Sequence, residues 1–440
     1  MNPGLAPRAA AWRVLHDLPR GIPFDLALRR ALGGLSETDR SLAHEIAAGV
    51  LRQRTALDAA LTPHLKAGTD AVRDDLLDIL RLGAYQILFL ERVPSHAAVD
   101  TAVTLGRRFG GASVGGFINA VLRKVADDSR TEEGSVRPSD RPTVRPQDLA
   151  AEYSHPEWLV SRWIARFGPE ETERLLRANN SRPPLVIQPA RWSLEAITAS
   201  LDAQGIAWAR APYGAGLVIR DHRPQDLPGL ATGACYIQDP AQILVVRHAA
   251  IPEGASIFDA CAAPGGKSVA LSRHAGSLVA ADLRPARARR LRENLRRAAD
   301  AECAVLVADA AAPPVRAQDA VLLDVPCLGT GTFARHPDAR WRVTPDALTR
   351  LTAQAARLIR AQAEVVRTGG LLVFATCSLE PEENELQVEA FLAADRRFRR
   401  EPPEGEALSA ELLTSAGDLF LLPHRHGTDG SYAARLRRVA

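Results

Sequence analysis

The chain has 440 residues, of which 46% are hydrophobic, and its 55 Lys and Arg against 52 Asp and Glu give a formal net charge of +3. This length can bury more than one hydrophobic core, so we expect about two to four domains. Five scattered cysteines exclude a disulfide framework and lack the close Cys and His spacing of a zinc site, and no apolar segment is long enough to span a bilayer. We therefore predict a cytoplasmic multidomain protein with reduced thiols, no metal and no membrane segment.

Residues 1–126 predict an all-helical domain. Apolar residues recur at helical spacing in 11–18 and again in 76–88. Glycine pairs at 110–111 and 115–116 predict a break before the last helix of the domain. The pattern is typical of a compact helical bundle.

Residues 127–148 change character abruptly, with three prolines among Ser, Thr, Arg and acidic residues. We expect an exposed, flexible linker there. Residues 149–245 then predict a small α+β domain. It begins with two short helices over 156–179 and continues with short strands and one helix over 194–204.

Residues 246–440 alternate strands with helices and predict a doubly wound, Rossmann-like α/β domain with a seven-stranded mixed sheet. Several strands are near-continuous apolar runs, as expected for parallel strands covered on both faces. The last two have no predicted helix between them and would form an antiparallel hairpin at one edge. The predicted strands cover residues 256–260, 277–282, 304–309, 320–324, 370–376, 419–422 and 432–438.

Four of these strands end in an acid, namely Asp259, Asp282, Asp309 and Asp324. Ligands of such a sheet bind at the carboxyl ends of the strands, where carboxylates can accept hydrogen bonds from ribose hydroxyls, an adenine amino group and an amino-acid ammonium. S-Adenosylmethionine offers all three groups. The alternative for each single acid is that it caps the following helix.

A turn of small residues follows the first strand and reads Cys261-Ala262-Ala263-Pro264-Gly265-Gly266-Lys267. It lacks the glycine spacing of dinucleotide sites and of phosphate loops, which counts against a nicotinamide dehydrogenase and an ATPase. Small residues let the backbone approach a cofactor closely. Lys267 is one of only three lysines, and it could steady the methionine carboxylate or a nearby loop. A plain tight turn with a solvated lysine is the alternative.

Two cysteines directly follow apolar strands, Cys327 in Asp324-Val325-Pro326-Cys327 and Cys377 in Thr376-Cys377-Ser378. Cytosine becomes nucleophilic at carbon 5 only after a thiolate has added to carbon 6, so its methylation requires a cysteine. A second thiol or another base can then remove the carbon 5 proton, and a protonated Asp324 near ring nitrogen 3 would stabilise the developing charge. A lone cysteine is more often a small core residue. The residues themselves leave open which thiol attacks.

Two groups of cations accompany these runs. The helix after Asp282 carries seven arginines, for which a solvated face is the favoured interpretation and a phosphate-backbone contact the alternative. The loop after Cys327 contains cations and an aromatic side chain that we expect to hold an extruded base and its flanking phosphates. These loop residues are Arg335, His336, Arg340, Trp341 and Arg342.

At these runs the chain resembles the bacterial RsmB (Sun or Fmu) family of 16S ribosomal RNA cytosine-C5 methyltransferases. The cofactor turn, Asp324 to Cys327, and Thr376 to Ser378 followed by Pro381-Glu382-Glu383-Asn384 are similar to its signature motifs, as is the run from Tyr236 to Gln242. The resemblance implies a NusB-like RNA-binding domain over 1–126, a linker over 127–148, an intermediate domain over 149–245 and a class I methyltransferase domain over 246–440.

The same resemblance implies roles for the site residues. Cys377 would attack carbon 6, and Cys327 would assist release. The cofactor S-adenosylmethionine would be bound by Cys261 to Lys267, Asp282, Asp309 and Asp324. The expected substrate is 16S ribosomal RNA, free or in an early assembly particle, and the expected state is a monomer. Transfer RNA as substrate, and a noncatalytic RNA-binding or assembly protein with a relic methyltransferase fold, are the alternatives.

Overall fold

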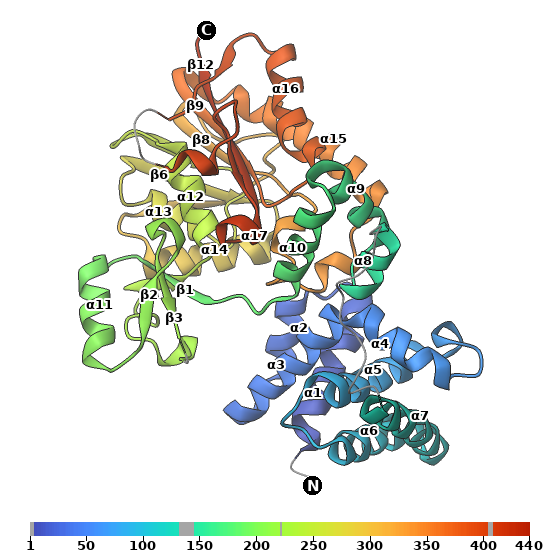
Figure 1. The fold of residues 1–440 in the computed structure, drawn as a ribbon. Coiled ribbons are helices and arrows are strands. Elements are labelled where there is room, and N and C mark those ends of the chain that lie inside the picture. Colours follow the sequence, from blue (N-terminus) through green and yellow to red (C-terminus); the bar gives the residue numbers. More distant parts are fainter. Residues whose placement is uncertain (1–3, 132–144, 221, 404–407) are drawn as a thin grey trace. The chain divides into compact units, whose positions relative to one another are not determined.

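The computed structural model describes residues 4–131, 145–220, 222–403 and 408–440 (Figure 1). The chain divides into two compact units. The first contains Met1–Asn180 and His336–Arg342, and the second contains Ser181–Arg335 and Val343–Ala440. In the part of the chain that is described, no helix is both long and apolar enough to cross a membrane.

The first unit is helical, as predicted, and α5 lies at the centre of its core. Leu80 and Leu82 of α5 are fully buried, and α5 contacts α1, α3, α4, α6 and α7. A helix that is apolar on most of its surface is stable only when neighbouring helices cover it. The helices of this unit are α1 Leu5–Asp17, α2 Phe24–Ala31, α3 Glu37–Arg52, α4 Arg54–Leu61, α5 Asp74–Phe89, α6 Ser95–Gly110, α7 Ala112–Thr131, α8 Pro146–Glu152, α9 Glu157–Phe167 and α10 Pro169–Asn180.

Two sequence-based expectations for this unit differ from the structure. The glycine pair 115–116 lies inside α7 and does not mark a break. At Gly115 a Cβ atom would lie 2.6 Å from Cγ of Arg107, so this glycine permits α6 and α7 to pack closely. The ends of the predicted linker are helical, because α7 continues to Thr131 and α8 begins at Pro146. The rest of the predicted linker lies outside the described residues.

The predicted α+β domain contains a four-stranded antiparallel sheet in the order β2-β3-β1-β4 with α11 packed against it. The two helices predicted at the start of this domain, α9 and α10, belong to the first compact unit. The second compact unit begins at Ser181, later than the predicted domain boundary at 149. The elements are β1 Leu185–Pro189, α11 Leu194–Ala203, β2 Trp208–Arg210, β3 Leu217–Ile219 and β4 Cys235–Ile237.

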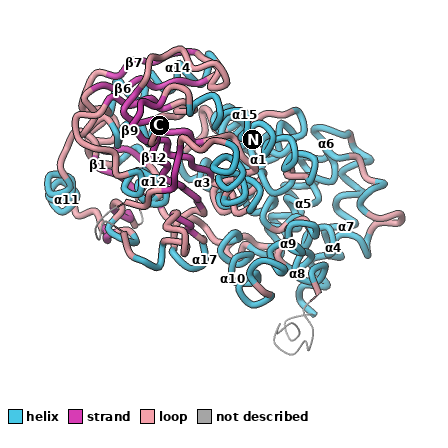
Figure 2. Tube along the Cα trace, turned by 90° about the horizontal axis from the view of Figure 1, so that it is seen from above, coloured by secondary structure: helices cyan, strands magenta, loops and turns pink. Residues whose placement is uncertain are grey.

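The C-terminal part of the second unit is built on a mixed sheet in the order β10-β12-β9-β8-β5-β6-β7. Strands β5 to β9 are parallel, and β12 runs antiparallel between β9 and β10. Figure 2 shows β6, β7, β9 and β12 of this sheet in one part of the molecule. They are β5 Ser256–Asp259, β6 Ser277–Asp282, β7 Cys303–Val307, β8 Gln318–Asp324, β9 Val366–Thr376, β10 Phe398–Arg400, β11 Leu419–Leu421 and β12 Ser431–Arg438.

Helices cover both faces of this sheet, as its apolar strands require. Alternate residues of β9 show the division, because Leu372 packs with α15 and α16 whereas Val373 packs with α12 and α13. Helix α14 lies against β6 and β7 (Figure 2). The helices are α12 Pro240–Ala249, α13 Gly266–Leu271, α14 Pro285–Ala298, α15 Pro345–Ala363, α16 Glu385–Ala394 and α17 Pro423–His426.

The predicted Rossmann-like mixed sheet is confirmed, with three differences in detail. An eighth strand, β10, was not predicted, and it pairs antiparallel with β12 at one edge of the sheet. The short helix α17 lies between β11 and β12, so the expected antiparallel pairing is present but the direct connection is not. The third strand ends at Val307, so Asp309 lies in the following loop and not at the strand end.

Candidate active site

Cys327 and Cys377 lie side by side, with their sulfur atoms 3.4 Å apart. They follow β8 and β9, which are neighbouring parallel strands, and Val325 donates its backbone N–H to the carbonyl of Ala375 at 3.0 Å. The carboxyl ends of parallel strands meet at one edge of a sheet, so two cysteines 50 positions apart in sequence reach one point. The sequence prediction that these two thiols form one site agrees with this geometry.

The surroundings of Cys327 favour its protonated form. The hydrogen bond with Cys377 and burial together raise the pKa of Cys327 well above its ordinary value. Cys327 therefore holds its proton more firmly than an exposed cysteine does.

Lys267 forms an ion pair with Asp324, whose Oδ2 lies 2.7 Å from Nζ, and it also donates to the side chain of Gln242. Burial alone would lower the pKa of Lys267, but the charge and hydrogen bond of Asp324 raise it. The pair joins the cofactor turn to the segment that leads to Cys327. In this pair Asp324 accepts a hydrogen bond from a cation.

The turn between β5 and α13 needs its glycines. Gly265 has a φ of +109°, and a Cβ there would lie 2.8 Å from Cδ1 of Leu291. At Gly266 a Cβ would lie 2.2 Å from Nε2 of Gln238. The run from Tyr236 to Gln242 therefore packs directly on the turn, which explains why the two motifs occur together.

Asp259 lies under this turn and is 1% exposed. Its Oδ2 accepts the hydroxyl of Ser268 at 2.6 Å, whereas its Oδ1 has no hydrogen-bond partner among the described residues. Burial raises the pKa of Asp259 to about 7. Burial also raises the pKa of the neighbouring Cys261 to about 12, so Cys261 is an inert thiol.

Asp282 and Asp309 both accept backbone hydrogen bonds from the segment that follows them. Asp282 accepts the N–H of Arg284 at 3.1 Å and pairs with Arg287 at 3.0 Å. Asp309 accepts the N–H of Ala311 at 2.8 Å. Asp282 lies at the end of β6, beside the turn. Asp309 lies beyond the end of β7, so of the four acids it is the least well placed to contact a ligand at the strand ends.

These residues fit S-adenosylmethionine. The turn offers a close backbone approach, Asp259 offers an unpartnered carboxylate oxygen, and Asp282 offers a second carboxylate at the neighbouring strand end. Asp324 and Lys267 connect this region to the two thiols. The described residues contain no cluster of His, Cys, Asp and Glu that could hold a metal ion.

Glu383 and Asn384 join the segments that follow the two cysteines. Both carboxylate oxygens of Glu383 accept the backbone N–H of Leu328, at 3.0 and 3.2 Å. Asn384 accepts the hydroxyl of Thr376 at 2.5 Å and donates to the carbonyl of Ser378 at 2.9 Å. The sequence analysis used this motif only for the resemblance and gave these residues no role.

The loop after Cys327 differs from its predicted use. Arg335 pairs with Asp239 at 2.6 Å and with Asp429 at 3.0 Å. Arg340 is fully buried in the first unit, where it donates to the side chain of Asn180 at 2.6 Å. Trp341 donates to the carbonyl of Leu51 at 2.8 Å in the same unit. These side chains bind protein groups in this structure, so they are not free to hold an extruded base.

The arginines of α14 form a solvent-exposed face, as the favoured interpretation predicted. Five of the six arginines in this helix are exposed, as is Arg284 just before it, and Arg297 is half-buried. Exposure alone does not make this surface a nucleic-acid site.

The fold and the site define an S-adenosylmethionine-dependent RNA methyltransferase. Residues 248–437 match the family model described as 16S rRNA methyltransferase RsmB/F, residues 6–127 match the NusB family, and residues 155–225 match the ferredoxin-like domain of RsmF/B-like methyltransferases. The chain is 33% identical to a probable ribosomal RNA small subunit methyltransferase B of Synechocystis sp., over 99% of this chain and 100% of that protein. It is also 33% identical to the ribosomal RNA small subunit methyltransferase B of Pseudomonas putida, over 99% of both.

The chain therefore belongs to the RsmB/F family of 16S rRNA methyltransferases, which are RNA cytosine-C5 methyltransferases. Among solved structures, that of PH0851 has a TM-score of 0.81 and 24% sequence identity, covering 100% of this chain and 99% of that chain. The structure of NSun6 from Pyrococcus horikoshii with SFG has a TM-score of 0.58 and 20% identity, covering 65% and 98%. These structures support the fold that the family membership implies.

Proposed function

We propose that this chain methylates carbon 5 of one cytidine of 16S ribosomal RNA, through a covalent bond between Cys377 and carbon 6 of the base. The observation that carries the proposal is the 3.4 Å contact of two thiols at neighbouring strand ends, beside a turn that fits the cofactor. The match to the family and to relatives named for the small ribosomal subunit supports 16S ribosomal RNA as the substrate.

In the first step the Cys377 thiolate bonds to carbon 6, and the electron pair of the carbon 5–carbon 6 double bond moves to carbon 5. Asp259, Cys261 to Lys267, and Asp282 would hold S-adenosylmethionine, which would supply an activated methyl group to the electron pair on carbon 5, with S-adenosylhomocysteine as the leaving group. Asp324 and Lys267 lie between the two regions and form a fixed dipole at the base-binding edge. Because the reacting atoms are blocked inside a helical stack, the base must be unpaired or flipped out.

In the second step carbon 5 loses its proton, the Cys377–carbon 6 bond breaks, and its electron pair returns to sulfur. Cys327 is the group that accepts this proton. Two of the causes that raise its pKa are its hydrogen bond with Cys377 and the charge of Cys377. Both are lost once Cys377 has bonded to carbon, so the pKa of Cys327 falls, its thiol gives its proton to solvent, and the resulting thiolate can accept the proton from carbon 5.

The test is incubation of the full chain with S-adenosylmethionine labelled in the methyl group and unmodified 16S transcript, followed by digestion to nucleosides. Label in 5-methylcytidine is the expected result, and a transfer RNA transcript of matched concentration should remain unlabelled. Label confined to transfer RNA would overturn the substrate. Label in another nucleoside of 16S RNA would overturn the proposed cytidine chemistry.

A further inference from the structure

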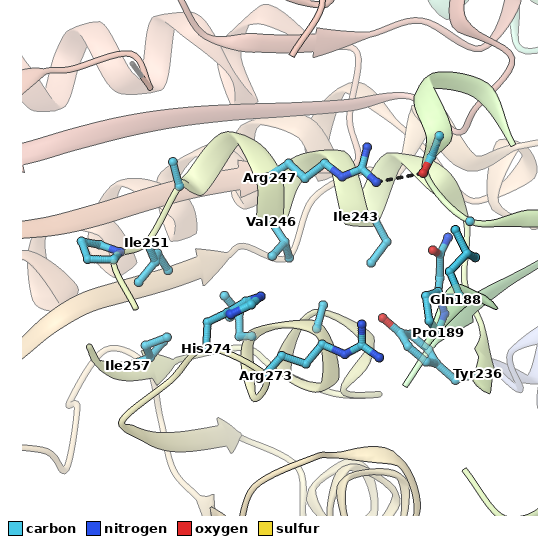
Figure 3. A pocket seen from close by; sticks show the side chains of 17 residues that line it. Gln188, Pro189, Tyr236, Ile243, Val246, Arg247, Ile251, Ile257, Arg273 and His274 are labelled. Atoms are coloured by element: carbon cyan, nitrogen blue, oxygen red, sulfur yellow. Dashed lines mark hydrogen bonds between the residues drawn. The ribbon is translucent and has the colours of Figure 1, made fainter. Parts of the chain in front are cut away.

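The second unit contains a cavity of about 410 Å³ (Figure 3). It lies at the C-terminal end of α13, whereas the cofactor turn lies at the N-terminal end of this helix. Gly266 and Lys267, at the start of α13, belong to the cofactor turn, whereas Ala270 and Leu271, at its end, line the cavity. Helix α12 forms the opposite wall. The volume falls within the range of about 300–1,000 Å³ that is typical of small-molecule sites.

The walls of the cavity are mostly apolar. Ile243 and Val246 of α12 point into it from one side, and Ile251 and Ile257 close one end (Figure 3). Branched aliphatic side chains that face a space of this size favour an apolar occupant, because burying its methylene groups removes apolar surface from water. This part of the cavity therefore favours a hydrocarbon group of a bound ligand.

One polar group points into the other end. Tyr236 of β4 is 5% exposed, and its hydroxyl has no hydrogen-bond partner among the described residues. Figure 3 shows this hydroxyl directed into the space between α12 and α13. Burial raises the pKa of Tyr236, so the hydroxyl keeps its proton and is a donor. A buried donor of this kind requires an acceptor.

The charges around the cavity show which acceptor fits. None of the 17 described residues that line it is acidic, whereas Arg247, Arg273 and His274 are basic. Arg247 donates to the carbonyls of Tyr213 and Gly214, both at 2.8 Å, so its charge faces neutral partners. Arg273 pairs with Asp300 at 3.2 Å and lies near the Tyr236 hydroxyl in Figure 3. The lining of the cavity therefore carries basic side chains and no carboxylate.

We propose that this cavity is a binding site for a small amphipathic carboxylate, with its hydrocarbon chain among Ile243, Val246 and Ile257 and its carboxylate on the Tyr236 hydroxyl. The site is separate from the cofactor turn, because the two lie at opposite ends of α13. It does not depend on which RNA the enzyme methylates.

Isothermal titration of the full chain with decanoate tests the proposal, at fixed ionic strength and with saturating S-adenosylhomocysteine in the cofactor site. The expected result is saturable binding of one decanoate, with decanol bound at least about tenfold more weakly because it lacks the charge. Competition between decanoate and S-adenosylhomocysteine would overturn the proposal, since it would place the probe in the cofactor site.

Two variants locate the binding. Val246→Trp fills the cavity and should abolish decanoate binding, whereas Val439→Trp places the same side chain at a residue that is 47% exposed and should leave binding unchanged. Tyr236→Phe removes only the hydroxyl and should weaken decanoate binding about tenfold and decanol binding by less, because an alcohol oxygen is a weaker acceptor than a carboxylate. Undetectable binding of decanoate to the unaltered chain, or equal affinity in the unaltered chain and Tyr236→Phe, would overturn the proposal.

Discussion

The carboxylate of Glu383 holds the backbone N–H of Leu328 with both oxygens, at 3.0 and 3.2 Å. Leu328 directly follows Cys327, and Glu383 lies in the segment that follows Cys377. A second bond joins the same segments, because Leu379 donates its N–H to the hydroxyl of Thr330 at 2.8 Å. These bonds thus join the two segments that carry the thiols.

Glu383 should be a positioning residue. Glu383→Ala leaves the buried N–H of Leu328 without an acceptor, which costs about 1–3 kcal/mol locally and loosens the Cys327 loop. We expect kcat to fall more than about tenfold while the Kd of S-adenosylhomocysteine stays unchanged. Glu383→Gln keeps one acceptor oxygen and should recover most of the activity. Glu389→Ala, at an exposed position of α16, is the control, and a loss in Glu383→Ala no larger than in this control would refute the role.

The Lys267–Asp324 pair should behave as a unit. Lys267→Met leaves the Asp324 carboxylate, which is about a third exposed, without its cation, and we expect a loss of about 1–3 kcal/mol in stability. Adding Asp324→Asn should recover part of this loss, because no unpaired charge remains. Thermal unfolding of the two variants, with Lys66→Met as the exposed lysine control, measures the coupling. Strictly additive effects would show that the pair does not matter for stability.

The two thiols should fail in different ways. Cys377→Ala should abolish both turnover and covalent RNA adduct, because no thiolate remains to attack carbon 6. Cys327→Ala should slow proton removal and leave an RNA-linked protein that migrates more slowly on a denaturing gel. Cys303→Ala is the control, since Cys303 is remote from this contact at the start of β7. Adduct in Cys377→Ala and none in Cys327→Ala would reverse the assignment.

Gly265 should be required for cofactor binding. In Gly265→Ala the added methyl group meets Leu291 and the backbone stays at a φ of +109°, so the turn must shift. We expect the Kd of S-adenosylhomocysteine to rise at least about tenfold by calorimetry. Gly254→Ala also has a positive φ, of +78°, but has no atom within 4 Å of the new Cβ. Equal affinities in the two variants would remove the turn from the cofactor site.

Cofactor affinity should depend on pH through Asp259. Burial raises the pKa of Asp259 to about 7, and the ammonium of the cofactor needs its charged form. Below pH 7 the proton must leave on binding, so the Kd of S-adenosylhomocysteine should rise about tenfold from pH 8 to pH 6. The same shift makes the folded state bind a proton that the unfolded chain has lost, so this group lowers stability as pH rises from about 4 to about 7.

Asp259→Asn provides the check on this pH dependence. The variant should bind S-adenosylhomocysteine weakly at pH 8 and with little change down to pH 6, because no proton is then exchanged at this position. Asp226→Asn, at an exposed position of the small domain, should keep the profile of the unaltered chain. A profile that persists in Asp259→Asn would assign the titration to another group.

The structure differs from the sequence-based predictions at residues whose chemistry suits two different structural roles. Arg340 and Trp341 stand after a catalytic motif, where cations and aromatic rings suit an extruded base, yet both are anchored within the first unit. Gly115 and Gly116 suit a turn, yet Gly115 serves close helix packing. In each case local chemistry allows both uses, and only distant residues decide between them.

The sequence by itself determined the order of helical, α+β and Rossmann-like parts, the cofactor turn and the two reactive cysteines, because periodicity and strand-end motifs are local properties of the chain. Only the tertiary structure decided that the two sulfur atoms lie 3.4 Å apart, that Lys267 pairs with Asp324 and that Glu383 holds the Cys327 loop. Those relationships join residues that are far apart in sequence, and they arise only when neighbouring strands bring their carboxyl ends together.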